Sequence, residues 1–523
     1  MNGKGEGTVV DIADASLAEL QAALAARKLG ASELTRAYLD RIDAIDRAGP
    51  ALNSVREVNP DALAIAASLD GKRPTKRRPL AGIPILVKDN IATGDRQHTT
   101  AGSLALADAR AKADAPLVAR LRAAGAVILG KANLTEFANI LAIGMPSGYS
   151  SLGGQVKNPY VPLLDDKGVP VVTPGGSSSG SAVAVAAGLC AAAIGTETSG
   201  SLLNPATQNG LVTVKPTVGL ISRSGILPIS HSQDTAGPLT RTVRDAAILL
   251  NVLAARDPKD PATRRHQRPA DYTDSLDADG LKGARIGVPS NPPYGDYRAQ
   301  TARAQPVMRN VIATLEAAGA IIVRADIAQI AWMGGPGTTM AVLNTNPHSP
   351  TTLSPATPPI VFIYELKHDL DRYLQEWATE TEMRSLADIV AFNAAHPEAM
   401  RFGQDLFLAA AATRGDLSEL EYKSARAMDL RAAGTLGLDA YMDAHRLDAV
   451  LFSGSSGAAI GAKPGYPSVQ VPAGLTSRDG TTEAPDYPLG VTFTGRAWSE
   501  ATLLRIAYAY EQASRARRAP TLG

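Results

Sequence analysis

The sequence predicts an α/β fold organised as one large domain. Three observations support this prediction: helical periodicity opens the chain, short apolar runs then alternate with helical segments, and one helix–glycine–strand unit occurs twice. The chain has 523 residues, of which 45% are hydrophobic, so it can bury a large core. We therefore expect residues 1–523 to form a single domain with local elaborations.

Two helices are expected at the start of the chain. The first is indicated by three leucines on one helical face: Leu17, Leu20 and Leu24. Gly30 is placed to end this helix. The second carries apolar residues at spacings of three and four: Leu34, Tyr38, Ile42 and Ile45. These patterns predict an N-terminal helical region over residues 1–70.

Buried strands are expected from short apolar runs further along the chain. Residues 83–90 read I-P-I-L-V-K-D-N, which indicates a strand that ends in polar residues. Segments 121–129 and 315–323 have the same sequence pattern. Each predicts a helix end, a glycine and a buried strand in that order. Residues 285–289 and 448–454 add two further strands to the expected sheet.

The region from residue 335 to residue 359 is rich in Pro, Thr, Ser and Asn. Strand and helix signals resume on both sides of it, which indicates a long surface loop or lid rather than a linker between domains. Together with the helical segments that follow, it predicts a lid or helical elaboration over residues 335–435.

Charge and composition exclude several classes of function. The 52 basic and 51 acidic residues are spread along the chain and leave a net charge of +1, so no basic surface for nucleic acid or an anionic membrane is expected. Cys190 is the only cysteine and the histidines are not clustered, so we expect neither a disulfide nor a metal site. The remaining partner class is a small or weakly charged molecule.

Targeting signals are missing from the sequence. The first residues lack an apolar signal core, and no window reaches the roughly 18 apolar residues of a membrane span. We therefore expect a cytoplasmic protein, or a secreted or periplasmic one if a signal peptide has been removed.

Residues 174–205 hold two glycine-serine turns separated by an apolar segment. Ser177 and Ser201 stand 24 residues apart in these turns. The plainest interpretation is a flexible loop that caps a helix over residues 182–193, with Ser179 or Ser181 as the N-cap. Capping does not account for the second turn, T-E-T-S-G-S. There Gly200 leaves room for a ligand, and successive backbone N–H groups can bind an oxyanion.

A second interpretation of the first turn is the nucleophile elbow of α/β-hydrolases. The sequence G-S-S-S-G at residues 176–180 matches that pattern and would make Ser178 the nucleophile, with His231 as the most suitable downstream base. Pro170 and Pro174 disfavour this hypothesis, because proline removes hydrogen-bond donors from the strand that should lead into the elbow.

Lys88 is the alternative to histidine as a base. It follows I-L-V at the expected end of a strand, so its stem should be buried. A free lysine has a pKa near 10.4, and acting as a base near neutrality requires a decrease of roughly 3 units, which burial can supply. Asp89 should not oppose this decrease, because successive strand residues point to opposite faces. Considered alone, a lysine at a strand end is more often a surface residue.

Taken together, these residues resemble the amidase signature family. The family pattern G-G-S-S-[GS]-G-S occurs at residues 175–181, the pattern G-[ST]-[DE]-T-x-G-S at 195–201, and the strand-borne lysine as V-K-D-N at Lys88. Further matches extend the resemblance across nearly the whole chain, at residues 130–139, 214–223, 233–241, 466–474 and 488–495. Within the family, the likeness is strongest to the bacterial peptide amidases.

The resemblance implies a fold and a set of roles. The fold would be a single large domain with a central mixed β-sheet covered by helices on both faces, with residues 80–255 as the signature core. Ser201 would be the nucleophile, Ser177 the relay after a cis peptide bond from Gly176, and Lys88 the base. The other implied site residues are Thr198, Ser199 and Gly200 in the oxyanion hole, Thr196 and Gly176 in support, and Ala138 and Asn139 against the substrate.

The activity implied by the resemblance is hydrolysis of primary amides, such as the C-terminal amides of peptides, through an acyl-enzyme and without a cofactor. One alternative is an aryl acylamidase or carbamate hydrolase with the same triad. A further alternative is a partner-dependent amidotransferase subunit. The protein is expected to be a monomer or homodimer.

Three positions depart from the family pattern near the expected site. Ser199 stands where Asp or Gly is usual, Asn204 where Arg is common, and Thr213 where Gly is usual. Residues 161–172 form an insertion-like segment before the first serine turn. These departures put the identity of the substrate in doubt more than the catalysis.

Overall fold

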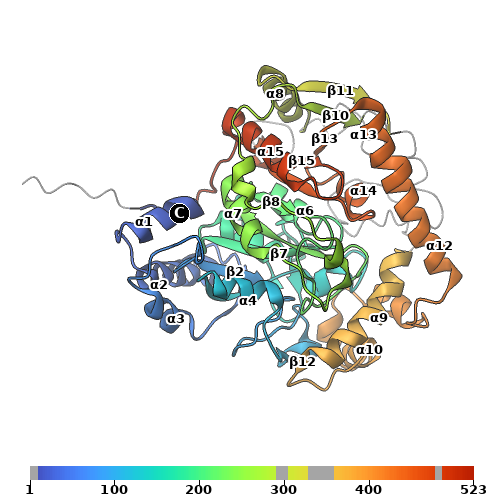
Figure 1. Ribbon diagram of the computed structural model, residues 1–523. Coiled ribbons are helices and arrows are strands. Elements are labelled where there is room, and N and C mark those ends of the chain that lie inside the picture. The colour runs from blue at the N-terminus through green and yellow to red at the C-terminus, as the bar shows by residue number, and fades with distance from the viewer. Residues whose placement is uncertain (1–9, 290–303, 328–358, 478–485, 523) are drawn as a thin grey trace, which may run out of the picture.

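A mixed β-sheet of 11 strands forms the centre of the molecule (Figure 1). The computed structural model describes residues 10–289, 304–327, 359–477 and 486–522. In spatial order the strands are β1 (Val55–Val58), β4 (Val127–Ala132), β2 (Pro84–Lys88), β7 (Ala192–Glu197), β9 (Thr235–Thr240), β8 (Val212–Lys215), β14 (Ser468–Ser477), β15 (Asp486–Thr494), β13 (Ala449–Ser453), β10 (Arg285–Pro289) and β11 (Ile321–Ala325). Two short ladders lie outside this sheet: β3 (Arg110–Ala111) with β12 (Ala378–Thr379), and β5 (Tyr149–Ser150) with β6 (Gly154–Gln155).

Strands β2 and β7 are neighbours inside the sheet and run parallel to each other. β2 also pairs in parallel with β4, whereas β7 pairs antiparallel with β9. Every residue of β2 and β7 is buried, as expected for strands that have neighbours on both edges and helices over both faces. Because the two strands are parallel, their carboxyl ends lie side by side at one edge of the sheet.

Helices cover the two faces of the sheet. α5 (Ser179–Ala186) and α6 (Leu203–Gln208) contact each other, while α15 (Glu500–Ser514) contacts both α7 (Val243–Leu253) and α8 (Ala304–Ala317). The helices nearer the N-terminus are α1 (Leu17–Ala25), α2 (Ala31–Arg41), α3 (Ala62–Leu69) and α4 (Pro116–Ala123). Within the described residues, no helix combines the length and the apolar content needed to cross a membrane.

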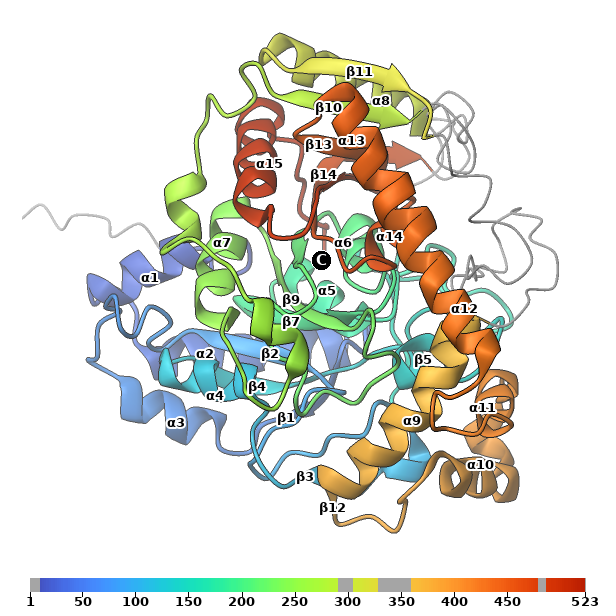
Figure 2. The same cartoon turned by 45° about the vertical axis from the view of Figure 1, so that its right-hand side comes forward.

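A helical arm runs along the outside of the sheet in Figure 2. It consists of α9 (Ile360–Glu376), α10 (Leu386–Ala395), α11 (Asp405–Ala411), α12 (Leu420–Asp429) and α13 (Ala440–His445), and the short α14 (Ala458–Ala462) follows β13. Apolar residues of α9, α10 and α11 form one core cluster with residues of the segment 137–145. Within this cluster the rings of Phe137 and Phe407 lie 4.7 Å apart. The arm therefore packs against the segment that carries Ala138 and Asn139.

The repeated helix–glycine–strand unit is present at both places, but only the first copy has the expected buried strand: β4 is buried throughout, whereas β11 lies at the edge of the sheet and Ile321 is 46% exposed. α4 ends at Ala123 before Gly125, and α8 ends at Ala317 before Gly319. Both glycines have φ +92°, a left-handed conformation that glycine adopts without steric cost. The expected helices at the start of the chain and the strands β2, β10 and β13 are also present, but Gly30 does not end the first helix: α1 ends at Ala25, and Gly30 is the N-cap of α2.

The helix expected over residues 182–193 is wrong. α5 begins earlier and ends at Ala186, and β7 begins at Ala192. Gly188 turns the chain between them with φ +67°, where a Cβ atom would lie 2.5 Å from the carbonyl oxygen of Ala13. The run is apolar throughout because β7 is buried on both faces, and such a strand has the composition of a buried helix.

The lid predicted over residues 335–435 lies only partly in the described part of the chain. The loop expected over residues 335–359 falls outside the described residues except for its last one. Residues 360–429 contain α9, α10, α11 and α12, so this part is helical.

Candidate active site

Lys88 is the last residue of β2, and its side chain is fully buried. Its Nζ donates hydrogen bonds to Ser177 Oγ at 2.7 Å and to Thr196 Oγ1 at 2.9 Å. Asn90 Nδ2 donates to the same Thr196 hydroxyl at 3.1 Å. Thr196 is on β7, so the parallel pairing of β2 and β7 places the Lys88 amine at the end of β7. The first glycine-serine turn, which carries Ser177, lies against this same end.

Burial sets the protonation state of Lys88. Removal from water lowers the pKa of its amine to about 7, although the nearby carboxylates of Asp234 and Glu197 act to raise it. Asp89 faces the other way, as the alternation along a strand predicts, and forms an ion pair with Arg56 at 2.6 Å between Nε and Oδ2. The amine can therefore be neutral near pH 7 and accept a proton.

The two serine turns lie against each other. The peptide bond between Gly176 and Ser177 is cis, and Ser177 is fully buried. The next N–H group, that of Ser178, donates to the carbonyl oxygen of Ser201 at 3.2 Å. The structure thus brings Lys88, Ser177 and the Ser201 backbone together around the end of β7.

The nucleophile-elbow hypothesis is wrong for Ser178. Its hydroxyl is fully buried, donates to the Thr196 carbonyl at 2.9 Å and accepts from the Thr196 N–H at 3.2 Å. Among the described residues no hydrogen bond joins Ser178 to His231, whose Nδ1 lies 2.8 Å from Asp369 Oδ2 and whose Nε2 lies 3.5 Å from Glu365 Oε1 on α9. Ser178 therefore fixes the turn to β7 rather than facing a substrate.

The expected side-chain caps of α5 are also wrong. The N-cap residue is Ser178, and its side chain makes no capping bond. Ser179 Oγ instead donates to the Gly175 carbonyl at 2.5 Å, and Ser181 Oγ donates to the Ile194 carbonyl at 3.3 Å. These hydroxyls stabilise the turn and β7. A helix over residues 182–193 would have left no strand at Ile194 for Ser181 to bond.

The turn after β7 is anchored by a buried carboxylate, that of Glu197. Glu197 Oε2 accepts the N–H groups of Leu202 at 2.7 Å and Leu203 at 3.0 Å. Gly200 has φ +88°, a conformation that side chains disfavour, and Ser201 keeps 8% of its surface exposed. The backbone N–H groups of this turn are therefore presented by a fixed loop at the start of α6.

Thr198 is the second anchor of the same turn. Its hydroxyl donates to Asp234 Oδ1 at 2.5 Å. Burial raises the pKa of Asp234 to about 6, although this hydroxyl and two backbone N–H groups act to lower it. Asp234 also borders a cavity of about 800 Å³. Ser199, by contrast, is only half-buried.

Ala138 and Asn139 lie in a buried turn beside Ser177. Phe137, Ala138 and Asn139 have φ values of +46°, +52° and +76°. The N–H of Thr135, just before this turn, donates to the Ser177 carbonyl at 3.0 Å. The structure therefore brings the predicted substrate-side segment against the first serine turn.

Two of the departures from the family pattern make specific bonds. Asn204 Oδ1 accepts the N–H of Gly176 at 3.0 Å, and its Nδ2 donates to Ser455 Oγ at 3.3 Å. Thr213 Oγ1 donates to the Pro238 carbonyl at 2.7 Å, between β8 and β9. Asn204 therefore supports the peptide that precedes Ser177, whereas Thr213 stabilises the sheet.

Sequence reasoning missed several supporting residues. Asn90, Glu197 and Asp234 all lie in motifs that carry the resemblance, but their contacts depend on how distant segments meet. The sequence also predicts no histidine cluster, whereas the fold brings His231 and His368 together with Asp369, close enough for a metal. This group does not include Lys88 or either serine.

The chain is similar to known amidases along most of its length. The Amidase family model matches residues 33–504. The native peptide amidase from Stenotrophomonas maltophilia is 44% identical, with a TM-score of 0.85 and 98% of this chain and 99% of that one covered. A probable amidase of Arabidopsis thaliana is 37% identical over 97% of this chain and 92% of its own length. A glutamyl-tRNA(Gln) amidotransferase subunit of Thermosynechococcus vestitus is 34% identical over 94% and 97%, respectively.

Proposed function

This chain belongs to the amidase family and is an amide-hydrolysing enzyme, and we propose that it acts on primary amides, chiefly the C-terminal amides of peptides. One observation carries the proposal. A fully buried amine, that of Lys88, donates a 2.7 Å hydrogen bond to Ser177 Oγ, and its pKa is lowered to about 7 by burial. A neutral amine bonded to a serine hydroxyl is the pairing that a proton relay needs.

The first chemical step forms an ester to Ser201. Neutral Lys88 accepts the proton of Ser177 Oγ, while Ser177 takes the proton of Ser201 Oγ. The Ser201 oxygen then bonds to the amide carbonyl carbon, whose oxygen becomes negatively charged. Backbone N–H groups of residues 198–201 bind this oxyanion, each well-placed donor contributing roughly 2.7–4 kcal/mol.

The second part of the reaction releases the products. The proton held by Lys88 returns through Ser177 to the departing nitrogen, the C–N bond breaks, and ammonia leaves. Water then loses a proton to the same relay and attacks the ester, which frees the carboxylic acid and restores Ser201. In this scheme Thr196 and Gly176 support the relay, and Ala138 and Asn139 contact the acyl side of the substrate.

The substrate class is tested by ammonia release. Similarity to a peptide amidase over nearly the full chain supports the choice of peptide amides. We expect ammonia from a panel of peptide amides and none from the same panel with Ser201→Ala. If no amino acid amide or peptide amide in the panel releases ammonia with the wild-type enzyme, the proposed substrate class is wrong. Faster turnover of an anilide than of any primary amide would instead assign an aryl acylamidase.

A second candidate function is supported by the similarity to an amidotransferase component over most of both chains. An enzyme that supplies ammonia to a partner should be weakly active alone and should form a stable complex. Size-exclusion chromatography of the protein from its native extract distinguishes these two functions. A free amidase elutes at the size of its own monomer or dimer, whereas a subunit bound to a partner elutes at a larger size.

A further inference from the structure

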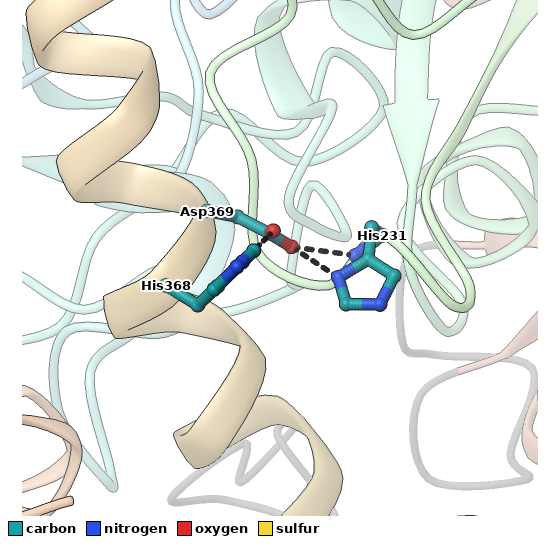
Figure 3. A group of neighbouring side chains, drawn as sticks. All are labelled: His231, His368 and Asp369. Atoms are coloured by element: carbon teal, nitrogen blue, oxygen red, sulfur yellow. Dashed lines mark hydrogen bonds and ion pairs between the residues drawn. The ribbon is translucent and has the colours of Figure 1, made fainter. Parts of the chain in front are cut away.

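Helix α9 is joined to the segment 229–234 by a cluster of two histidines and an aspartate (Figure 3). Asp369 Oδ2 accepts from His231 Nδ1 at 2.8 Å and from the His231 backbone N–H at 2.9 Å, and Asp369 Oδ1 lies 2.9 Å from His368 Nδ1. The ligand atoms of this group lie within 4.8 Å of one another. A metal would have to displace these hydrogen bonds. The contacts therefore favour a structural link between α9 and the segment 229–234.

Glu365 lies one helical turn before Asp369 and contacts the same segment. Its side chain is fully buried. Glu365 Oε2 accepts the N–H of Ser232 at 3.0 Å, and the hydroxyls of Ser230 and Ser232 also donate to this carboxylate. Tyr422 on α12 donates to Oε1 at 2.7 Å. Four donors thus converge on one buried carboxylate, and three of them come from the segment 229–234.

The far end of that segment reaches the turn that carries the nucleophile. Asp234 Oδ2 accepts the N–H groups of Ile229 and Ser230, each at 2.9 Å, which closes the segment into a compact loop. Asp234 Oδ1 accepts the Thr198 hydroxyl at 2.5 Å. A continuous set of hydrogen bonds therefore runs from Glu365 through Ser230 to Asp234 and Thr198.

We propose that Glu365 is a positioning residue for the reaction: from α9 it fixes the segment 229–234, and through Asp234 it fixes Thr198 and the N–H groups that bind the oxyanion. This inference rests on the proposed role of Ser201 and its turn. It assigns the helical arm a part in catalysis, although within the described part of the chain no hydrogen bond joins α9 directly to Lys88, Ser177 or Ser201.

The carboxylate is the group that this role requires. An ionised carboxylate only accepts hydrogen bonds, so it can bind all four converging donors, whereas an amide turns a donor toward two of them. Glu365→Gln keeps the size of the side chain but replaces one carboxylate oxygen with an NH₂ group. On the Oε2 side this group opposes the Ser232 N–H, and on the Oε1 side the Ser232 and Tyr422 hydroxyls must turn to accept from it, so the charge-assisted bonds that hold the segment are lost and the segment can shift. Because the oxyanion N–H groups act mainly on the transition state, such a movement lowers kcat more than it raises KM.

Two rates test the proposal in the full-length enzyme. The first is kcat and KM for ammonia release from a peptide amide. The second is the rate at which a fluorophosphonate labels Ser201, a reaction in which the serine oxygen bonds to phosphorus and fluoride leaves. Labelling needs the nucleophile and the oxyanion turn but no particular substrate. If Ser201 is not labelled in the wild-type enzyme, Ser201 is not the nucleophile. That result contradicts the proposed function, not the role of Glu365.

The control is another acidic residue on the same helix. Asp371 accepts the N–H of Leu386 at 2.6 Å and so binds α10 instead of the segment 229–234. We expect Glu365→Gln to lower both kcat and labelling at least tenfold, about 1.4 kcal/mol, with KM and the thermal midpoint little changed. Asp371→Asn should leave both rates within about twofold of wild type.

Two outcomes overturn the proposal. One is a folded Glu365→Gln enzyme whose labelling and kcat stay within about twofold of wild type. The other is an equal fall for Glu365→Gln and Asp371→Asn, which would indicate a general effect of loosening the arm. If Glu365→Gln does not fold, Tyr422→Phe, which removes one donor to Glu365, should lower labelling about threefold, and an unchanged rate refutes the role.

Discussion

Replacing Lys88 with methionine removes the proposed base and keeps most of the side-chain volume. Burial lowers the pKa of Lys88 from 10.5 to about 7, which corresponds to about 5 kcal/mol against the protonated amine in the folded protein. Methionine carries no such cost. It leaves the Ser177 and Thr196 hydroxyls without one partner, which costs about 1–3 kcal/mol. We therefore expect Lys88→Met to be more stable than wild type by about 2–4 kcal/mol at pH 7 and below.

The gain in stability should depend on pH in one direction. The unfolded chain holds the Lys88 proton up to about pH 10.5, whereas the folded protein releases it near pH 7. Between these values the unfolded state binds more protons, so the wild-type protein becomes more stable as the pH rises. The advantage of Lys88→Met should therefore shrink by about 3 kcal/mol between about pH 7 and pH 9.5.

The same variant should lose activity by at least about 10³-fold, because the proposed relay would have no proton acceptor. In wild type, kcat/KM should rise through about pH 7 as Lys88 deprotonates. Lys131 provides a matched control on the adjacent strand β4. It is also fully buried, burial lowers its pKa to about 8, and its amine bonds the Ile91 carbonyl and the Thr99 hydroxyl rather than a serine. Lys131→Met should keep activity within about fivefold of wild type.

Urea unfolding at the two pH values and ammonia release from a peptide amide measure both effects. Two results would contradict this role for Lys88. In the first, Lys88→Met retains more than about a tenth of wild-type activity. In the second, its stability relative to wild type does not change with pH, which would mean that the pKa of Lys88 is not lowered in the folded protein.

Three further predictions concern neighbouring residues. Ser177→Ala should lower kcat/KM at least about 100-fold with little change in the thermal midpoint, since the hydroxyl bonded to Lys88 is lost; equal activity would remove Ser177 from the relay. Gly195→Ala should cost about 1–3 kcal/mol in urea unfolding, because a Cβ atom would lie 2.7 Å from Ser178 Oγ, and unchanged stability would contradict that packing. Cys190 is fully buried, and burial raises its thiol pKa to about 12, so iodoacetamide should neither modify the native protein nor reduce its activity, as mass spectrometry and the ammonia assay can check.

Local patterns were sufficient to predict much of the sheet. β10 coincides with the apolar run at residues 285–289, and Gly125 and Gly319 mark the same helix-to-strand turn because both adopt a left-handed backbone. The failure at residues 182–193 has a physical cause. A strand paired on both edges and covered on both faces has no polar side, so its sequence does not distinguish it from a buried helix.

The site could be predicted only where the family resemblance supplied the pairing. Nothing in the local sequence indicates that Lys88 meets Ser177, because that contact depends on β2 and β7 being parallel neighbours. Asp234 and Glu365 were missed for the same reason. Each is an ordinary acidic residue in its own segment, and its hydrogen bonds to Thr198 or to the segment 229–234 form only when the fold brings these segments together.

The proposed mechanism depends above all on Ser201 carrying the acyl group during amide hydrolysis. Peptide mapping by mass spectrometry, on enzyme quenched in acid during turnover of a peptide amide, measures this directly. We expect the peptide containing Ser201 to gain the mass of the acyl group, and we expect no such gain in Ser201→Ala. An acyl group on Ser178, or steady turnover by Ser201→Ala, would contradict the mechanism.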